Sequence, residues 1–424
     1  MIVILGGGLA GLATSLFLKD VPHVVLEADA VPGGLCRTRA VDGFLFDYTG
    51  HLLHLRDPRI VALVEELLPG GLETVERRAY IRTCGVTLPF PFQANLHGLP
   101  REVVAECIVG FAETLGTAVP ADPEISFRDW SLAVLGRGIS EAFMFPYNAK
   151  LFRREPAEMT ADWVSWAIPK PNLREVVQGA LGVVNRGMGY NATFRYPRSG
   201  GIGALPEALH RRVADRVRCG ARVTTVDLDR RTVRLEGGET LAWDRLVSTA
   251  PLPALLGMVG EPAPELDWTV VGCLNLGFDR PGLGGDAQWI YFPDPEVPFY
   301  RVGFSHNIVP GVCPEGTSSL YVEFGMKRGE AADPEHLEAA TVAALRREGF
   351  LDGDERVVVR DFVRIDPGYV IFDRARRRVM AEAVPRLEAS GVIPIGRYGA
   401  WTYSYMERAM LDGLDAAERL RRGA

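Results

Sequence analysis

The sequence predicts an α/β fold in which a Rossmann-like dinucleotide-binding domain is joined to a helical insertion and an antiparallel β-sheet domain. Three observations predict this fold. A glycine-rich turn separates a short β-branched segment from a segment with helical apolar spacing; helical spacing recurs between residues 101 and 181; and strand-like alternation dominates residues 222–325. A chain of 424 residues exceeds one ordinary hydrophobic core, so we expect two or three domains.

The first 27 residues carry a dinucleotide-binding pattern. Residues 2–5 predict a buried strand, residues 9–18 a helix and residues 23–27 a second strand. Gly6, Gly8 and Gly11 lie between the first strand and the helix in GxGxxG spacing, which lets backbone approach a pyrophosphate at the helix N-terminus. Glu27 ends the second strand, where an acidic side chain accepts hydrogen bonds from a ribose diol. The alternative is a structural turn beside a surface glutamate.

The later patterns suggest how the domains follow one another. Helical spacing predicts helices at 101–115, 127–135 and 173–181. Alternation predicts strands within 222–249 and at 268–275, 287–292, 298–304 and 319–325, followed by a strand at 393–395 and a long helix from about Tyr405. We expect a discontinuous dinucleotide-binding domain at 1–80, 198–260 and 389–424, a helical domain at 96–186, and a sheet domain for the substrate at 81–95, 187–197 and 261–388.

Composition narrows the classes of function. The formal charge of -7 argues against a nucleic-acid-binding protein, which normally carries a basic face. The six cysteines lie far apart and form no CxxC pair, which favours a reduced, cytoplasmic protein without a metal site. No apolar run reaches the ~20 residues that span a bilayer, and no signal-peptide pattern is present, so we expect no membrane partner. The oligomeric state stays open, a homodimer included.

Two further glycine-containing segments favour FAD over NAD as the dinucleotide. Residues 32–38 form a second glycine-rich turn with a cation, Gly34 and Arg37 among them, and residues 396–399 precede the last helix. These segments resemble the FAD superfamily of amine oxidases, protoporphyrinogen oxidase, Rab GDP-dissociation inhibitors and UDP-galactopyranose mutase. The resemblance implies that the C-terminal segment completes the FAD site through Arg397, Tyr405 and Met406. It also places Val223 at the adenine, although a valine in a strand is equally a plain core residue.

Longer blocks resemble the UDP-galactopyranose mutase family, particularly its eukaryotic-type members. They are LPFPFQAN at 88–95, FMFPYNAK at 143–150, NATFRYP at 191–197, 289–301, DPGY at 366–369 and GRYGAWTY at 396–403. The blocks keep their order and approximate spacing over almost the whole chain. The resemblance implies a non-redox reaction in which the N5 atom of reduced FAD attacks the anomeric carbon of a nucleotide sugar, UDP-linked by expectation, and pyranose and furanose forms interconvert. NADPH and NADH are the candidate reductants.

The residue types suit such a substrate. Phe90, Phe92 and Phe143 can enclose a pyrimidine while Gln93 reads its polar edge. Arg301 can form two hydrogen bonds with a phosphate, and Tyr291, Tyr369 and Tyr403 can donate hydroxyl groups. Asn148 and Asn191 can position sugar or phosphate groups. For each aromatic residue taken singly, a place in the core is the alternative. The segment DYTGH at 47–51 resembles the family's glycine–histidine loop, which implies that Gly50 and His51 lie beside the flavin.

The sequence also departs from that family. Ala167 stands where a second phosphate-binding arginine is expected, Phe152 replaces a tryptophan, and Asn307, a candidate substrate-binding residue, replaces a tyrosine. Arg37 and Thr38 fit the amine-oxidase pattern better than the mutase pattern. Two other functions therefore stay open: an FAD oxidoreductase of the amine oxidase or protoporphyrinogen oxidase type, and a binding protein of the dissociation-inhibitor type without a cofactor.

Overall fold

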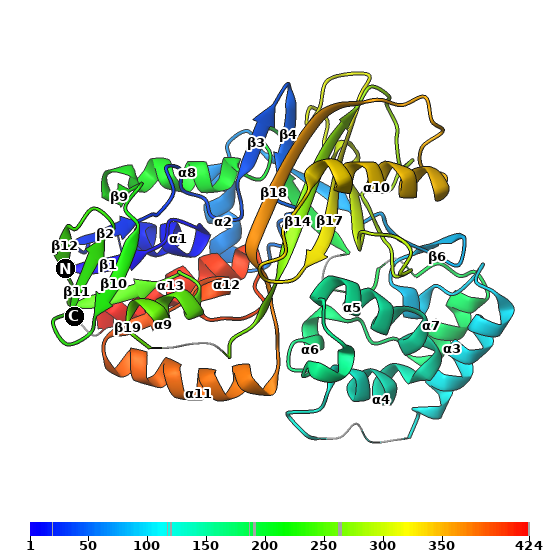
Figure 1. Cartoon of the computed structure of the whole chain (residues 1–424), viewed down its shortest axis with the longest axis horizontal. Coiled ribbons are helices and arrows are strands. Elements are labelled where there is room, and N and C mark those ends of the chain that lie inside the picture. The colour runs from blue at the N-terminus through cyan, green and yellow to red at the C-terminus, as the bar shows by residue number, and fades with distance from the viewer. Residues whose placement is uncertain are drawn as a thin grey trace.

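The computed structural model describes residues 1–18, 20–116, 118, 121–185, 187–189, 192–261 and 265–422. It confirms the α/β class, with helices and several β-sheets arranged in distinct layers (Figure 1). In this view the N-terminal elements lie at one end, the long strands cross the middle, and the helices between residues 101 and 180 lie at the opposite lower end. The domain boundaries expected from the sequence stay a prediction.

The first layer is a five-stranded parallel sheet. Its order is β19, β13, β1, β2, β9, with bounds Val392–Pro394, Arg245–Ser248, Ile2–Leu5, His23–Leu26 and Val217–Arg218. Every residue of β1 is buried, as expected for a parallel strand covered on both faces. Helix α1 (Leu9–Phe17) packs against α13 (Met406–Arg422) and α8 (Ala204–Val213). The two helices α1 and α13 approach so closely that a Cβ atom on Gly413 would lie 2.7 Å from the Thr14 nitrogen.

The central layer is a seven-stranded sheet of order β18, β14, β17, β16, β15, β6, β7. The bounds are Val357–Val370, Trp268–Phe278, Ser318–Met326, Arg301–Phe304, Trp289–Tyr291, Ala79–Thr83 and Val86–Pro89. All neighbours are antiparallel except β15 and β6, which run parallel. The strands predicted at 268–275, 287–292, 298–304 and 319–325 are therefore confirmed as members of one largely antiparallel sheet. Helix α10 (Pro334–Arg347) lies beside it (Figure 1).

Helices fill the segment between residues 101 and 180, as the periodicity predicts. They are α3 (Arg101–Glu113), α4 (Phe127–Ile139), α5 (Phe145–Phe152), α6 (Val164–Ala167) and α7 (Leu173–Ala180), with a π-helical turn at Ser140–Met144 and a 3-10 turn at Pro156–Glu158. Asn172 and Glu175 form a capping box that begins α7. Helices α3 and α4 approach so closely that a Cβ atom on Gly138 would lie 2.3 Å from a backbone carbon of Glu106.

Smaller elements complete the fold. A three-stranded antiparallel sheet contains β10, β11 and β12, and two pairs are formed by β3 with β4 and by β5 with β8. Their bounds are Val223–Asp227, Thr232–Leu235, Thr240–Ala242, Thr38–Val41, Phe44–Asp47, Leu72–Glu76 and Thr193–Pro197. The remaining helices are α2 (Pro58–Leu67), α9 (Leu252–Met258), α11 (Arg374–Ala389) and α12 (Gly396–Gly399), and 3-10 turns lie at Phe92–Ala94, Ala214–Arg216 and Ser305–Asn307.

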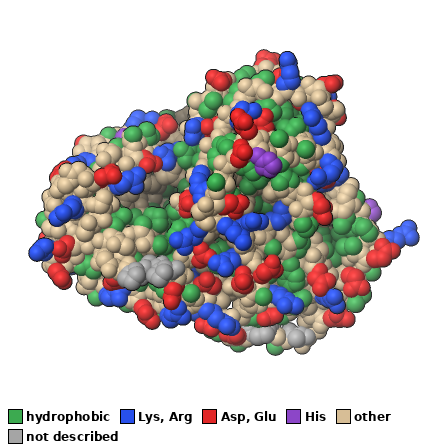
Figure 2. Space-filling view, viewed as in Figure 1, with side chains coloured by type: hydrophobic (Ala, Val, Ile, Leu, Met, Phe, Trp, Pro, Cys, Tyr) green, Lys and Arg blue, Asp and Glu red, His purple; other side chains and the backbone are tan. Residues whose placement is uncertain are grey.

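The described surface shows mixed character. On the face in Figure 2, Lys and Arg side chains alternate with Asp and Glu and do not gather into one basic patch. Within the described ranges, no helix combines the length and apolarity needed to span a bilayer.

Candidate active site

One cavity of about 830 Å³ connects the parallel sheet with the central sheet and the helical segment. Its wall begins at the glycine-rich turn after β1, continues past the Gly50–His51 loop, and ends among aromatic side chains of α5, β15 and the segment before α13. This volume lies in the range of ordinary ligand sites. The described residues that line it include most of the cofactor residues and all five catalytic residues expected from the sequence.

The dinucleotide end is built by glycines. Gly8 is the N-cap residue of helix α1 and provides no side-chain cap, so the first N–H groups of the helix have no partner within the helix. Gly8, Leu9 and Ala10 at this helix start all line the cavity. A Cβ atom on Gly8 would meet only the Gly34 Cα, at 3.8 Å, and would therefore point into the open cavity. A Cβ atom on Gly11 would instead lie 1.9 Å from the Gly6 carbonyl oxygen, which shows that Gly11 serves the packing of helix on strand.

Glu27 lies beside this turn, as the sequence predicts. Its carboxylate accepts hydrogen bonds from the Gly7 nitrogen at 2.6 Å and from the Asp29 nitrogen at 2.8 Å. Arg37 forms an ion pair with Asp29 at 3.0 Å and donates from Nε to the Gly34 carbonyl at 2.9 Å. The ion pair therefore attaches the second glycine-rich turn, residues 32–38, to the segment that follows β2. Both Glu27 and Arg37 line the cavity.

The far part of the dinucleotide end is apolar. Val223, the first residue of β10, is 8% exposed and lines the cavity together with Ala221, Ala254 and Met258. These side chains make a slot suited to a flat aromatic base. The sequence allows two interpretations of Val223, an adenine contact or a plain core residue. Val223 is buried and also lines the cavity, so both interpretations stay open.

The Gly50–His51 loop forms the middle of the wall. Thr49 has φ of 84°, a left-handed conformation that non-glycine residues rarely adopt. Burial, with the charges of Arg397 and Arg301 nearby, lowers the pKa of His51 to about 4, so the imidazole is neutral at neutral pH. Both Gly50 and His51 line the cavity, and their position beside the flavin stays a prediction.

Arg301 begins β16 and lines the cavity close to this loop. Its Nε donates to Glu323 Oε2 at 3.0 Å and its Nη2 donates to Glu323 Oε1 at 2.5 Å. Tyr291 and Tyr369 line the same region. The cation expected to bind phosphate is therefore present, and a buried carboxylate holds it from behind.

Arg397 is a second cation in this wall. Its guanidinium carbon lies 5.3 Å from the ring centre of Tyr369, 5.6 Å from that of Tyr403 and 5.7 Å from that of Tyr398. Its two terminal nitrogens donate to the carbonyls of Ser404 and Gly368. The Nε is buried and has no hydrogen-bond partner among the described residues, while the side chain as a whole lines the cavity.

The residues expected to form the pyrimidine slot lie outside this wall. Phe92 and Phe143 stack on each other at 5.2 Å and are buried, and the Gln93 amide donates to the Pro169 carbonyl at 2.5 Å. Asn148 donates to the Met144 carbonyl at 2.7 Å. Phe90 stands one layer behind the wall, 5.3 Å from the ring of Tyr291. The structure thus buries Phe92, Gln93, Phe143 and Asn148 and leaves Phe90 partly exposed, and the contact of all five with a substrate stays a prediction.

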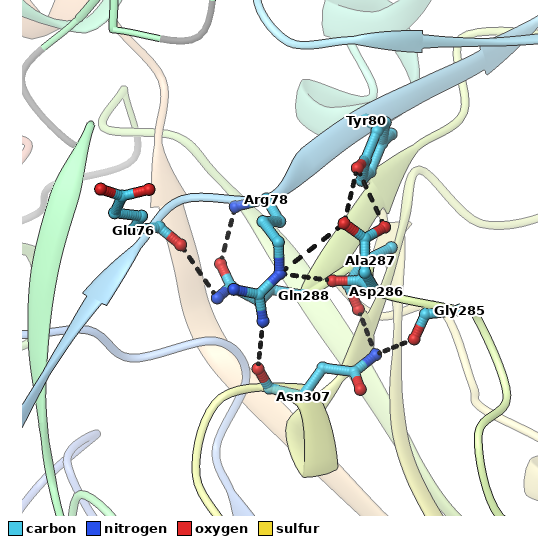
Figure 3. Close-up of polar contacts among 8 residues, drawn as sticks. All are labelled: Glu76, Arg78, Tyr80, Gly285, Asp286, Ala287, Gln288 and Asn307. Atoms are coloured by element: carbon cyan, nitrogen blue, oxygen red, sulfur yellow. Dashed lines mark hydrogen bonds and ion pairs between the residues drawn. The ribbon is translucent and has the colours of Figure 1, made fainter.

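Two expected asparagines have separate outcomes. Asn191 lies outside the described residues. Asn307 belongs to a polar network at the ends of the inner strands β6, β15 and β16 (Figure 3). Its side-chain amide donates to the carbonyls of Gly285 and Ala287, and its backbone carbonyl accepts from Arg78. The described structure does not bring Asn307 to the cavity. Its network instead holds the chain just before Trp289, and Trp289 lines the cavity.

Sequence reasoning missed several residues of the aromatic end. Tyr147, Trp163 and Tyr321 line the cavity, and Glu323 supports Arg301. Strand alternation at 319–325 puts Tyr321 and Glu323 on one face, and this was the available signal. Ala167 also lines the cavity, so the position of the missing arginine does belong to the site. No cluster of three His, Cys, Asp or Glu side chains suited to a metal lies within the described part of the chain.

The residues fit FAD. The open side of Gly8, the acidic side chain at the end of β2, the apolar slot at β10 and the Arg397 side chain follow one another along a single cavity. Fold and site therefore define a dinucleotide-binding protein of the flavoprotein class. The chain belongs to the flavin containing amine oxidoreductase family, whose family model matches residues 9–421, and it is an enzyme of that FAD superfamily.

Individual relatives agree with this family. The chain is 25% identical over 387 residues to a zeta-carotene-forming phytoene desaturase of Myxococcus xanthus, covering 76% of this chain and 71% of that protein. The crystal structure of a reduced UDP-galactopyranose mutase superposes with a TM-score of 0.92 at 25% identity, covering 100% of this chain and 94% of the other. Wild-type putrescine oxidase bound to putrescine superposes at 0.71 with 17% identity, covering 99% and 98%.

Proposed function

We propose that the chain is an FAD-dependent nucleotide-sugar mutase of the UDP-galactopyranose mutase type. It interconverts the pyranose and furanose forms of a sugar carried on a nucleoside diphosphate, with UDP as the expected nucleotide. The TM-score of 0.92 to a reduced UDP-galactopyranose mutase supports the proposal, because it extends over the whole chain and clearly exceeds the 0.71 for putrescine oxidase.

The observation that carries the proposal is the charge of the cavity wall. Its described lining contains four arginines, Arg37, Arg222, Arg301 and Arg397, and a single acidic residue, Glu27. Asp29 pairs with Arg37 and Arg222 from outside the wall, and Glu323 pairs with Arg301, so these carboxylates offset part of the charge. The N–H groups that the arginines present to the cavity still favour anions over cations. Two diphosphates, one from the dinucleotide cofactor and one from the substrate, suit such a wall. A cationic amine does not suit it, because the space between Tyr369 and Tyr403 already faces the Arg397 guanidinium.

Reduced FAD, when bound, supplies the nucleophile for the anomeric carbon of the sugar. Arg301 binds the departing diphosphate and keeps it close, so that it can return to the rearranged sugar. The hydroxyl groups of Tyr291 and Tyr369 offer hydrogen bonds to the same group. Phe152, Trp163 and Tyr403 pack together at ring distances of 5.4–6.2 Å and exclude water from the reacting carbon. A neutral His51 neither repels the arginines nor competes with them for the anion.

A second function is favoured by a different observation. Ala167 adds no cation to the aromatic end, where Arg301 and Arg397 are the described arginines, and the wall there is otherwise aromatic and aliphatic. An apolar substrate and hydride transfer to oxidised flavin, as in an oxidoreductase, fit that apolar wall. The matched desaturase from Myxococcus xanthus belongs to this alternative.

One experiment separates the two functions. The holoprotein is reduced with dithionite under anaerobic conditions and incubated with UDP-galactopyranose and related nucleotide sugars, and the products are resolved by chromatography. The mutase isomerises one of them only after reduction and consumes no electron acceptor. The oxidoreductase leaves the sugars unchanged, and its oxidised flavin is bleached by polyene or amine substrates alone. Bleaching without isomerisation would overturn the mutase proposal.

A further inference from the structure

Glu323 is a buried carboxylate directly behind the cavity wall. It lies within β17 with 0% of its side chain exposed, while the Arg301 side chain is 17% exposed toward the cavity. The two residues are direct cross-strand partners, since β16 and β17 pair antiparallel with Arg301 opposite Glu323. Their contact is a two-point hydrogen-bonded fork, which fixes the plane of the guanidinium.

Burial of two charged side chains costs desolvation free energy, so the presence of this ion pair in the interior calls for an explanation. Two charges removed from water recover little net stability from their mutual attraction, and apolar residues of similar size commonly serve stability equally well. The neighbouring positions on the same face of the sheet carry no charge: Cys273, which lies opposite Glu323 on β14, and Tyr321 are both buried. A stabilising role alone therefore accounts poorly for a charged pair at this point of β16 and β17.

The fork leaves part of Arg301 available. A guanidinium has five N–H donors, and the Glu323 fork engages one on Nε and one on Nη2. The remaining donors belong to the edge that faces the cavity, where Arg301 is part of the wall. Glu323 thereby determines which N–H groups a bound anion can meet and keeps the side chain from turning toward other acceptors.

The same carboxylate also faces the Gly50–His51 loop. The Gly50 N–H lies 3.5 Å from Glu323 Oε1, the oxygen that accepts from Arg301 Nη2. Tyr321, two residues earlier on the same face of β17, fills the space left by Gly50 and Gly303. The anion-binding edge of Arg301 and the loop expected beside the flavin are thus set by neighbouring residues of one strand.

We propose that Glu323 is a positioning residue for the substrate diphosphate: it orients Arg301 and offsets the arginine charge, so that the diphosphate is held in place without being bound too tightly to turn over. This inference rests on the proposed function. Tight binding of the ground state does not accelerate the chemical step, whereas correct placement of the leaving group does. An arginine with its charge partly offset and its plane fixed meets both needs.

The test compares Glu323→Gln with Glu323→Asp in the FAD-loaded protein. UDP is titrated by calorimetry at low and high salt, and kcat is measured with the sugar substrate. For Glu323→Gln, removal of one negative charge beside Arg301 is expected to tighten UDP binding about 10-fold and to steepen its salt dependence. The kcat value is expected to fall about 100-fold, because the guanidinium loses its fixed plane. Glu323→Asp keeps the charge, so UDP affinity stays within about twofold of wild type while kcat falls.

Glu355→Gln is the matched control. Glu355 is also a buried carboxylate, 1% exposed, that pairs with an arginine of the same sheet region, Arg280, and it does not line the cavity. It is expected to change neither UDP binding nor kcat. A structural role of Glu323 alone predicts weaker UDP binding in Glu323→Gln with unchanged salt dependence, and that result would overturn the inference. Wild-type protein that binds no UDP would instead overturn the proposed function itself, so the two failures are distinguishable.

Discussion

A Cβ atom on Gly50 would lie 2.3 Å from the hydroxyl oxygen of Tyr321. Gly50 belongs to the first segment of the chain and Tyr321 to β17 of the central sheet, and both line the cavity. The Tyr321 side chain thus packs directly against the backbone of the loop that carries His51. The position of this loop, and of any flavin beside it, depends on a glycine that leaves room for a distant aromatic ring.

We therefore expect Gly50→Ala to displace the loop and to weaken FAD binding at least about 10-fold, because neither backbone nor ring can move cheaply in a packed interior. Tyr321→Phe in the same chain is expected to restore part of the affinity, since it removes the closest atom. FAD content per protein, from the flavin absorbance, measures both. Gly237→Ala, where a Cβ would meet nothing within 4 Å, is the control. Full FAD content in Gly50→Ala would disprove the contact.

Arg301→Ala tests the proposed anion site. We expect turnover to fall by about 10²–10³-fold, the usual loss when one charge-stabilising donor is removed, while FAD remains bound. The variant leaves Glu323 buried without its cation, so Arg301→Lys, which keeps a charge but loses the fork, is measured alongside it. Arg356→Ala removes an exposed arginine, 82% accessible, and serves as the control. A colourless Arg301→Ala protein would contradict the role assigned here.

Ala167→Arg tests the missing second cation. Ala167 lines the cavity at the aromatic end, so an arginine there can reach a diphosphate held by Arg301. A charge-assisted hydrogen bond contributes about 1.5–3 kcal/mol, and UDP affinity is expected to rise by about 10-fold or more. Ala167→Gln adds comparable bulk without the charge and is expected to leave affinity unchanged or lower. If both variants weaken UDP binding equally, the diphosphate does not lie near residue 167.

His51 is expected to make the free energy of unfolding depend on pH. Burial lowers its folded pKa to about 4, below the ordinary value of 6.5, so the unfolded chain binds the extra proton first. The contribution of His51 to stability is therefore complete above pH 6.5 and is lost as the pH falls toward 4. His51→Asn is expected to reduce the loss of unfolding free energy between pH 7 and 4.5 by about 2 kcal/mol. Urea titrations at the two pH values measure it.

The same comparison has internal controls. His54 has a pKa lowered in the same direction, to about 4, whereas burial raises the pKa of Asp47 to about 6, which acts in the opposite direction. The wild-type slope therefore sums several groups, and only the difference between wild type and His51→Asn reports on His51. Identical slopes for the two proteins would show that His51 is not buried as a neutral group.

Much of the site could be predicted because its residues follow local rules. The glycine spacing at Gly6, Gly8 and Gly11 and the acidic residue at the end of β2 depend only on the strand–turn–helix unit. Arg301, Tyr369 and Tyr403 were predicted through blocks that resemble a known family. The structure brings these distant segments to one cavity, which no periodicity could establish alone.

Other features depend on pairings that the sequence does not encode locally. Strand β18 alternates apolar with charged residues and then runs through Pro367 and Gly368, turn-forming residues that obscured it. Helix α11 is rich in arginine and contains Pro385, so its apolar stripe is faint. Glu323 stands in an apolar strand, and its role becomes evident only from the register that sets it opposite Arg301.

Gly8 and Gly11 permit a test that separates cofactor binding from folding. A Cβ on Gly8 points into the cavity, with its nearest atom at 3.8 Å, while a Cβ on Gly11 would meet the Gly6 carbonyl oxygen at 1.9 Å. Gly8→Ala is expected to keep the unfolding temperature of the apoprotein within a few degrees of wild type. Its FAD affinity should nevertheless fall about 100-fold, because the added methyl group occupies the space that a pyrophosphate needs.

Gly11→Ala is expected to behave in the opposite order, since the clash lies inside the fold. The free energy of unfolding should fall by at least about 2 kcal/mol, in the manner of an overpacked core, and FAD is lost only as a consequence of the damaged helix contact. Thermal unfolding of the apoproteins and FAD titration of each variant measure the two effects separately. If Gly8→Ala bound FAD as tightly as wild type, the turn after β1 would not hold a pyrophosphate, because the methyl group would then stand in space that the ligand does not enter.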